Sequence, residues 1–312
     1  MGTASGNVRI SKIIFTFFLF GFQVILLLSC TSKEQTSKKN ETTLSSGVLK
    51  VLSDDTFKPL LGTSVEIFES LTPATKIELE YMPQEQAFSD LLNGKTDVII
   101  AGRPLNKAEE ASIKYKGLFP KVNQIASDGL VFIVSKSNSE LRISEDKLAK
   151  ILSGSLKTQL ICDKGNSANI LYLKKKFNLP KEIHNVLAAG SDSAVIEYVI
   201  KHPETIGVIG MALVSDYEDP KVKSRLSNIN LLSIEYKDST GKAVVGYPTL
   251  EELATKKYPF IREIFIINLD GSTNLGTGFA NFMVSERAQR IVLKSGLLPF
   301  QLPRRELIIV ND

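Results

Sequence analysis

Strand-like and helix-like segments alternate along the chain from Val48 to Leu293, and this alternation restricts the possible folds more than any other feature. Short apolar runs predict strands, and apolar residues three or four apart predict helices. The predicted strands cover 48–52, 77–81, 98–100, 129–134, 160–161, 206–209 and 265–267, and the predicted helices cover 59–71, 84–92, 145–152, 195–200 and 279–293. This order is typical of an α/β fold with mainly parallel sheets flanked by helices.

Length and composition exclude several classes of protein. The 312 residues are 43% hydrophobic and 23% charged, a globular balance in a chain long enough for two domains. Two cysteines and two histidines disfavour a disulfide scaffold, a metal site and histidine-dependent chemistry. The net charge of +4 disfavours a nucleic-acid partner. We therefore expect no metal and no cofactor.

The N-terminus has the pattern of an export signal. Arg9 and Lys12 precede an apolar run over 13–28, which is shorter than the roughly 20 residues that span a bilayer. The run ends in Leu27 and Leu28, and Ser29 and Cys30 follow, as in a bacterial lipobox. We predict a signal peptide over 1–29 and a lipid such as palmitate on Cys30. The protein would then be periplasmic, anchored to the inner or outer membrane of a Gram-negative bacterium. A plain N-terminal membrane anchor is the alternative.

The segment 30–47 is polar and has no hydrophobic period, which predicts a tether between the lipid and a folded body. With Cys30 lipidated, Cys162 has no partner cysteine. Its apolar neighbours Leu160 and Ile161 favour a buried, unreactive thiol over a reactive one.

Three strand ends have the composition of an anion site. They are the segments 53–56, 101–104 and 163–169, rich in Ser, Asp, Asn and Gly. Ligands of open parallel sheets lie beyond the carboxyl ends of the strands, where helix N-termini offer free N–H groups to an anion. Arg103 adds a forked donor suited to an oxyanion. The alternative is that the short polar residues only cap helices and that Arg103 is a surface residue.

From about Leu49 to Pro303 the chain resembles the periplasmic phosphate-binding proteins of ABC importers, in the divergent form found among Bacteroidetes-type lipoproteins. The segments that carry the resemblance are 100–105 (IAGRPL), 126–134 (ASDGLVFIV), 190–193 (GSDS), 206–210 (IGVIG) and 288–299 (AQRIVLKSGLLP). Their order and spacing extend over nearly the whole chain after the signal.

The resemblance implies a two-lobed periplasmic binding protein of type II, whose lobes close on one ligand. Segments 48–126 and 259–312 would form lobe I and 127–258 lobe II, with two hinge crossovers near Ser127 and near Tyr258. It further implies a monomer that captures phosphate or a similar oxyanion in the cleft between the lobes. The partners would be the permease subunits of an ABC transporter and, through Cys30, a membrane.

Carried over by position, the resemblance also assigns the site. The implied ligand-binding residues are Ser53, Asp54, Asp55, Thr56, Arg103, Asp128, Asp163, Ser167, Ala168 and Asn169. The family has an Asp where this chain has Gly102, and an Arg where it has Asp163. We therefore expect an exchanged Arg103–Asp163 pair across the cleft. An Asp acceptor would select phosphate, which keeps a proton, over sulfate. Solvent-facing caps at 54–55 and a hinge turn at Asp128 are the alternatives.

Two other functions remain open. An exported phosphoesterase could use Ser53, Thr56 or Ser167 as nucleophile, but it would need a nearby base. His184 and His202 both look like exposed residues at helix ends, so we do not expect an enzyme. A binding fold that has lost its solute and serves as a surface or signalling adaptor is the second alternative.

Overall fold

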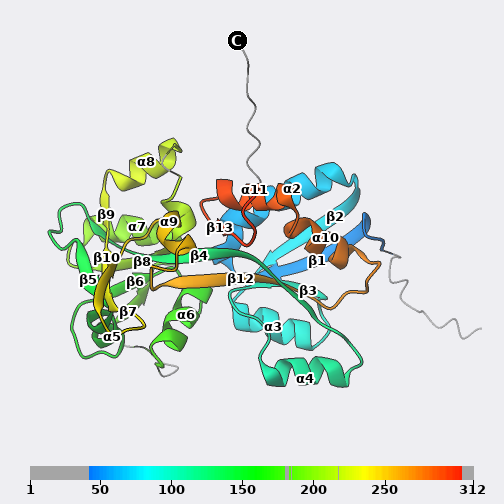
Figure 1. Cartoon of the computed structure of the whole chain (residues 1–312), viewed down its shortest axis with the longest axis horizontal. Helices are drawn as coiled ribbons and strands as arrows, with labels where there is room; N and C mark the ends of the chain where they lie inside the picture. The colour runs from blue at the N-terminus through cyan, green and yellow to red at the C-terminus, as the bar shows by residue number, and fades with distance from the viewer. Residues whose placement is uncertain (1–41, 180–182, 184, 217, 304–312) are drawn as a thin grey trace, which may run out of the picture. The chain divides into compact units, whose positions relative to one another are not determined.

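The computed structural model describes residues 42–179, 183, 185–216 and 218–303 (Figure 1). The predicted signal peptide, Cys30, most of the predicted tether and His184 lie outside the described residues. Strand β1 (Ser46–Ser53) begins inside the segment predicted as tether. The residues from Thr42 onward form one compact unit, and everything below concerns that unit.

One large sheet runs through the described part of the chain. Its order is β2 (Ala74–Tyr81), β1, β3 (Val98–Ala101), β12 (Ile261–Asn268), β4 (Lys121–Ser135), β8 (Ile206–Gly210), β6 (Leu160–Cys162) and β7 (Val186–Ala188). Strand β1 is parallel to β2 and β3, and β6 is parallel to β7 and β8. Strands β12 and β4 are antiparallel to each other and to their outer neighbours. The sheet thus consists of two parallel blocks joined by an antiparallel ribbon.

The first block has a core on each face, because successive strand side chains point to opposite sides. Leu49 and Val51 of β1 pack in one core, and Leu52 packs in the other. Helices α2 (Lys58–Leu71), α10 (Leu275–Met283) and α11 (Glu286–Lys294) cover the first face, and α3 (Gln84–Leu92) and α4 (Lys107–Tyr115) cover the second (Figure 1). We call this part the first lobe.

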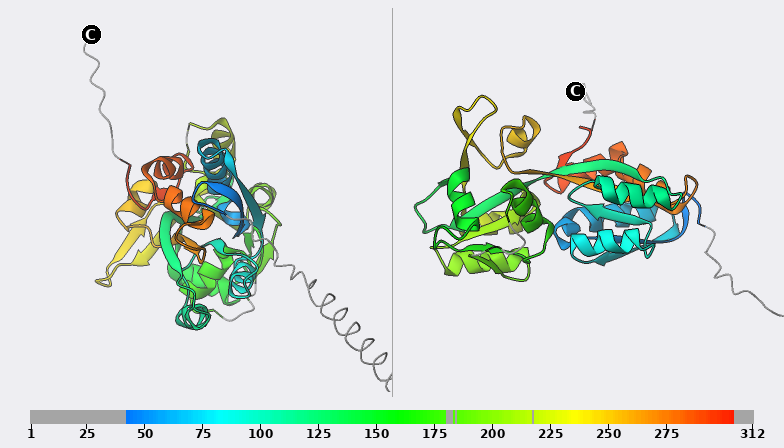
Figure 2. Two further views of the ribbon diagram at one scale, coloured as in Figure 1. Left: turned by 90° about the vertical axis from the view of Figure 1, so that its right-hand side faces the viewer. Right: turned by 90° about the horizontal axis from the view of Figure 1, so that it is seen from below.

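The second block carries its own core, built around β4, β6 and β8. Helices α5 (Glu145–Leu152), α6 (Ala168–Lys176) and α7 (Asp192–Lys201) contribute buried aliphatic side chains to it. A separate sheet of β11 (Ala243–Gly246), β10 (Ser233–Lys237) and β5 (Arg142–Ser144) lies on this side of the body (Figure 2). We call this part the second lobe. Its smaller elements are η2 (Met211–Leu213), α8 (Pro220–Leu226), β9 (Ile229–Leu231) and α9 (Leu250–Ala254).

Strands β4 and β12 connect the lobes. The 15-residue strand β4 places Ile125 and Ala126 in the first core and Leu130 in the second. All of β12 pairs with residues 121–129 of β4, and Phe260, just before β12, packs in the second core. The site described below lies where this ribbon passes between the lobes.

Most predicted elements are present, and two helices, α3 and α5, have the predicted bounds. The single helix predicted over 279–293 is wrong. Helix α10 ends at Met283, and the Ser285 side chain accepts a hydrogen bond from the Ala288 N–H and begins α11. An N-cap side chain of this kind starts a new helix even where the apolar period continues.

Cys162 is fully buried in β6, as predicted, and burial raises the pKa of its thiol to about 12. Across the residues that the structure describes, no helix is long and apolar enough to cross a membrane. The same residues contain no group of three or more His, Cys, Asp or Glu side chains that could hold a metal ion.

Candidate functional site

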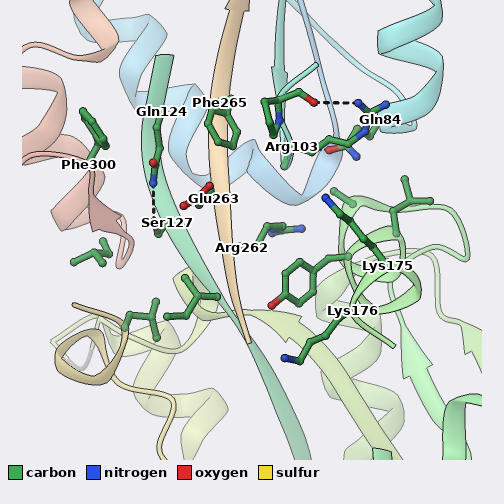
Figure 3. A pocket seen from close by; sticks show the side chains of 18 of the residues that line it. Gln84, Arg103, Gln124, Ser127, Lys175, Lys176, Arg262, Glu263, Phe265 and Phe300 are labelled. Atoms are coloured by element: carbon green, nitrogen blue, oxygen red, sulfur yellow. Dashed lines mark hydrogen bonds between the residues drawn. The ribbon is translucent and has the colours of Figure 1, made fainter. Parts of the chain in front are cut away.

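A cleft of about 950 Å³ lies between the two lobes beside the connecting ribbon (Figure 3). The first lobe contributes Gln84, Gly102 and Arg103 to its lining, and helix α6 contributes Ala168, Tyr172, Lys175 and Lys176. Figure 3 shows the Arg262 side chain reaching from β12 into the space between these two walls. The cleft therefore brings together residues that are far apart in the sequence.

Asp54 lies where three helix starts meet. It follows β1 directly, is 2% exposed, and accepts a hydrogen bond from the Thr56 N–H at 3.1 Å as the N-cap of η1 (Asp55–Phe57). The other carboxylate oxygen, Oδ2, accepts from the Gln84 N–H of α3 and from the Ala168 N–H of α6, each at 3.2 Å. Neither α3 nor α6 has a capping side chain of its own. One carboxylate thus holds N–H groups from both lobes, and the solvent-facing alternative for Asp54 is wrong.

Arg262 forms the charged centre of the site. It is 1% exposed, and it donates to Asp128 Oδ2 and to Asn169 Oδ1, both at 2.8 Å. Asp128 also accepts from the Met211 N–H, and its alternative as a hinge turn is wrong because it lies inside β4. Since Arg262 and Asp128 are opposite each other in the β12–β4 ladder, the strand register positions the pair. The contact with Asn169 extends the pair to the second lobe.

Gly102 leaves the room that Arg262 occupies. A Cβ atom at Gly102 would lie 3.0 Å from Arg262 Cδ, 3.2 Å from Gln84 Oε1 and 3.3 Å from Phe57. An Asp at this position, as the resemblance expects, would meet the Arg262 side chain. The glycine at position 102, in place of that acid, therefore leaves room for the buried Arg262 side chain from β12.

The predicted Arg103–Asp163 pair is wrong. Arg103 lines the cleft, but its guanidinium forms salt bridges with Glu109 at 2.9 Å and Glu85 at 3.2 Å and stacks 3.5 Å above the Phe88 ring. Asp163 accepts a hydrogen bond from the Ser167 hydroxyl at 2.7 Å. Because Glu109 also completes the capping box of α4, the first lobe holds Arg103 in place through its own acids.

The remaining predicted residues lie around Asp54. Ser53 is fully buried and donates to the Asp54 carbonyl, and Asp55 forms a salt bridge with Lys164 across the lobes. The Asp55 side chain is 37% exposed, whereas Asp54 is buried. The three junctions predicted from strand ends therefore differ. Segments 53–56 and 163–169 meet around the buried Asp54, just behind the cleft-lining residues Gln84 and Ala168, in a region that we call the floor of the cleft, whereas Arg103 faces acids of its own lobe.

Three buried donor side chains near this floor have an atom with no hydrogen-bond partner among the described residues. They are Thr56 Oγ1, Asn169 Nδ2 and Arg262 Nε, and their residues are 9%, 0% and 1% exposed. Leaving such groups unpaired in a folded protein is costly. The floor of the cleft thus offers more donors than the protein's own acceptors use.

Acidic side chains surround these donors. Burial raises the pKa of Asp54 and of Asp128, and Arg262 acts in the opposite direction on both. Asp192, the first residue of α7, has a shielded Oδ1 with no partner among the described residues, although the residue as a whole is half-buried. Burial, with added repulsion from Asp163 and Asp128, raises the pKa of Asp192 to about 7.

Sequence reasoning missed Arg262, Gln84 and Asp192 as site residues. Gln84 is the first residue of a correctly predicted helix, and Asp192 is the first residue of α7, shortly after the end of β7, so both carried a usable signal. Arg262 had none, because it is the second residue of β12 and lies outside the apolar strand predicted over 265–267. Lys176, at the end of α6, pairs with Glu145 and lies over the Phe260 ring.

Replacing Arg103 by alanine should lower the free energy of unfolding by about 1–3 kcal/mol, because it removes charge-assisted hydrogen bonds to Glu109 and the stacking on Phe88. Ligand affinity should change little, because those contacts stay within the first lobe. Urea unfolding measures the first quantity, and Arg103→Lys is the matched control. A large loss of affinity at unchanged stability would instead make Arg103 a ligand contact.

The comparisons with known proteins place the chain in a family. A model described as the PBP superfamily domain matches residues 34–287. The chain belongs to the PBP superfamily. Phosphate-binding protein PstS of Borreliella burgdorferi is 26% identical to this PBP-superfamily chain, over 90% of the chain and 96% of that protein. Protein SphX of Synechococcus elongatus is 25% identical, over 68% of the chain and 65% of that protein.

Solved structures show the same fold. A putative phosphate ABC transporter substrate-binding protein with bound phosphate, from Clostridium perfringens, superposes with a TM-score of 0.65. It is 17% identical and covers 82% of this chain and 100% of its own. An ABC-type phosphate transport receptor from Vibrio cholerae gives a TM-score of 0.64 at 15% identity, covering 81% and 100%. The predicted α/β periplasmic binding fold of type II is confirmed.

Proposed function

We propose that this protein is an exported, lipid-anchored receptor that captures phosphate or a similar oxyanion and delivers it to the permease of an ABC transporter. The observation that carries the proposal is the convergence of N–H groups from α3 and α6, on opposite lobes, upon a single carboxylate. A helix N-terminus favours a negative charge, so two of them aimed at one point form a receptor for an oxyanion.

The unpaired donors strengthen this assignment. Thr56 Oγ1, Asn169 Nδ2 and Arg262 Nε add hydroxyl, amide and guanidinium groups to the N–H groups of the helices. A buried anion needs hydrogen bonds in place of its hydration, and an arginine supplies the strongest of them. The relatives named as phosphate-binding proteins support phosphate as the ligand.

The rest of the proposal concerns the arrangement in the cell. Segments 48–126 and 259–312 would move as one lobe and 127–258 as the other, with the β4–β12 ribbon as hinge. The export signal over 1–29 and the lipid on Cys30 would keep the receptor at a periplasmic membrane surface, beside its permease. Mass spectrometry of the protein from the bacterial envelope tests the anchor, since a chain that begins at lipidated Cys30 has a defined mass.

Calorimetric titration of the full chain, purified in detergent, tests ligand capture. We expect inorganic phosphate to bind in the micromolar range or tighter, and arsenate to compete with it. Sulfate should bind more weakly, because the buried Asp128 carboxylate can accept a ligand proton that sulfate lacks. Absence of heat with every oxyanion would overturn the proposal.

Replacing Ala168 by proline should weaken phosphate binding by about 10- to 100-fold, because it removes one N–H donor to the anion. Proline is accepted at the first residue of a helix, and the preceding Ser167 already has the extended backbone that proline requires. Lys107→Pro, at the first residue of α4, is the matched control and should leave the affinity unchanged. Equal affinities for the two variants would remove the α6 N-terminus from the site.

One observation favours a second function, that of an adaptor that binds no solute. The Asp54 carboxylate already satisfies the N–H groups that would hold an anion. In that case the closed arrangement of the lobes would itself be the signal that a partner protein reads. The titration separates the two functions, since an adaptor takes up no oxyanion.

A further inference from the structure

The Asp54 carboxylate contacts both lobes in the way a bound oxyanion would. Its Oδ2 accepts from Gln84 in the first lobe and from Ala168 in the second, each at 3.2 Å. Its Oδ1 accepts from the Thr56 N–H at 3.1 Å. A carboxylate resembles two oxygens of a phosphate in charge and spacing, so it can take the same N–H groups.

A second observation places a ligand site at the same point. Asn169 Nδ2 and Arg262 Nε are donors on residues 0% and 1% exposed, and neither atom has a partner among the described residues. Asn169 follows Ala168 directly, and Arg262 donates through its other nitrogens to Asn169 and Asp128. The donors that hold Asp54 and the donors that lack an acceptor therefore belong to one cluster.

Asp54 is also more than a local cap. A cap of η1 needs only the bond to the Thr56 N–H, which one carboxylate oxygen provides. The second oxygen reaches residues 30 and 114 positions away along the chain. The bond to Gln84 stays within the first lobe, and the bond to Ala168 joins the lobes, next to the Asp55–Lys164 salt bridge that also crosses between them.

We propose that Asp54 is a tethered stand-in for the ligand, which holds the lobes together when no oxyanion is bound and competes with phosphate for the N–H groups of α3 and α6. The proposal rests on the proposed function, and it names Asp54 as the residue that lowers the apparent affinity of the site for phosphate. Phosphate displaces the carboxylate, because two anions cannot share the same donors. The apparent affinity for phosphate equals the intrinsic affinity multiplied by the fraction of molecules in which Asp54 does not occupy the N–H groups.

The variants Asp54→Ala and Asp54→Asn test the competition. The first removes the stand-in, and the second keeps a cap for η1 but loses the charge. With full chain in detergent and inorganic phosphate as the titrant, we expect both variants to bind about 10-fold tighter than the natural chain or better. Asp219→Asn is the matched control, because Asp219 also caps a helix, α8, and bonds to the Lys221 N–H within the second lobe, so its replacement frees no N–H group of α3 or α6. It should shift the affinity less than threefold.

A distance measurement without phosphate gives an independent readout. Spin labels on cysteines introduced at Lys114 in the first lobe and Lys223 in the second, with Cys30→Ser, report the separation of the lobes. We expect Asp54→Ala to widen the distance distribution and phosphate to narrow it again.

The outcomes separate the two proposals. If the natural chain binds phosphate and both Asp54 variants bind equally or more weakly, Asp54 is a ligand contact or a cap and the stand-in proposal is wrong. If neither the natural chain nor any variant binds phosphate, the proposed function fails. In that case a widened lobe distance in Asp54→Ala alone still supports the stand-in, and an unchanged distance overturns it.

Discussion

Replacing Arg262 by methionine should lower the free energy of unfolding by about 3–5 kcal/mol, the largest effect that we expect from a single substitution. Asp128 is 2% exposed and would lose the cation that pairs with it, in a place where burial already raises its pKa. Asn169 would lose the charged donor to its Oδ1 as well. Chemical denaturation of the two proteins measures the difference.

The matched control for this substitution is Arg290→Met. Arg290 pairs with Glu286 at 2.9 Å, close to the 2.8 Å between Arg262 and Asp128, but both of its side chains are about half exposed. Such a surface pair contributes about 0.3–0.5 kcal/mol. The double variant Arg262→Met with Asp128→Leu should recover part of the loss, because it removes the stranded charge. Equal losses of unfolding free energy in Arg262→Met and Arg290→Met would show that the buried Arg262–Asp128 pair stabilises the protein no more than an exposed pair does.

Replacing Asp192 by asparagine should stabilise the protein above neutral pH. The pKa of Asp192 in the folded protein is about 7, above its ordinary value of 3.8, so between these values the folded state binds more protons than the unfolded state. The stabilisation from this group is therefore complete below about pH 4 and is lost as the pH rises through 7. Over this shift the contribution is up to about 4 kcal/mol.

The asparagine variant does not lose this contribution, so its unfolding free energy should exceed that of the natural chain at pH 8 and approach it near pH 4. Denaturation curves across this range measure the difference. Asp146→Asn is the matched control, since Asp146 also lies in the first turn of a helix but is exposed. Parallel profiles for the natural chain and Asp192→Asn would contradict the assignment of a titrating, buried carboxyl.

Much of the fold could be predicted, because the signals that define it are local. The bounds of α3 and α5 follow from apolar spacing and from the residues around their starts. The split between α10 and α11 could not be found from spacing, because the apolar period continues across Ser285 and only its cap reveals the break. The extension of β4 back to Lys121 is set by pairing with β12, which lies more than a hundred residues further along the chain.

The site was predictable only in part, for a related reason. Asp54, Ser167 and Ala168 stand at strand ends and helix starts, positions that a sequence reveals. The partner of Asp128 depends on strand register, and nothing near Arg262 in the sequence indicates it. Arg103 carried the strongest local signal for an anion contact, yet Glu85 and Glu109 of its own lobe take up its charge.

The central claim is that one oxyanion lies between the N-termini of α3 and α6. Anomalous diffraction from crystals grown with arsenate, a heavier analogue of phosphate, locates such an anion directly. We expect an arsenic peak about 4 Å from the backbone nitrogens of Gln84 and Ala168, which puts arsenate oxygens about 3 Å from these nitrogens, with the Asp54 carboxylate moved away from them. A peak only at the rim of the cleft near Lys175, with Asp54 still bonded to both nitrogens, would contradict the account.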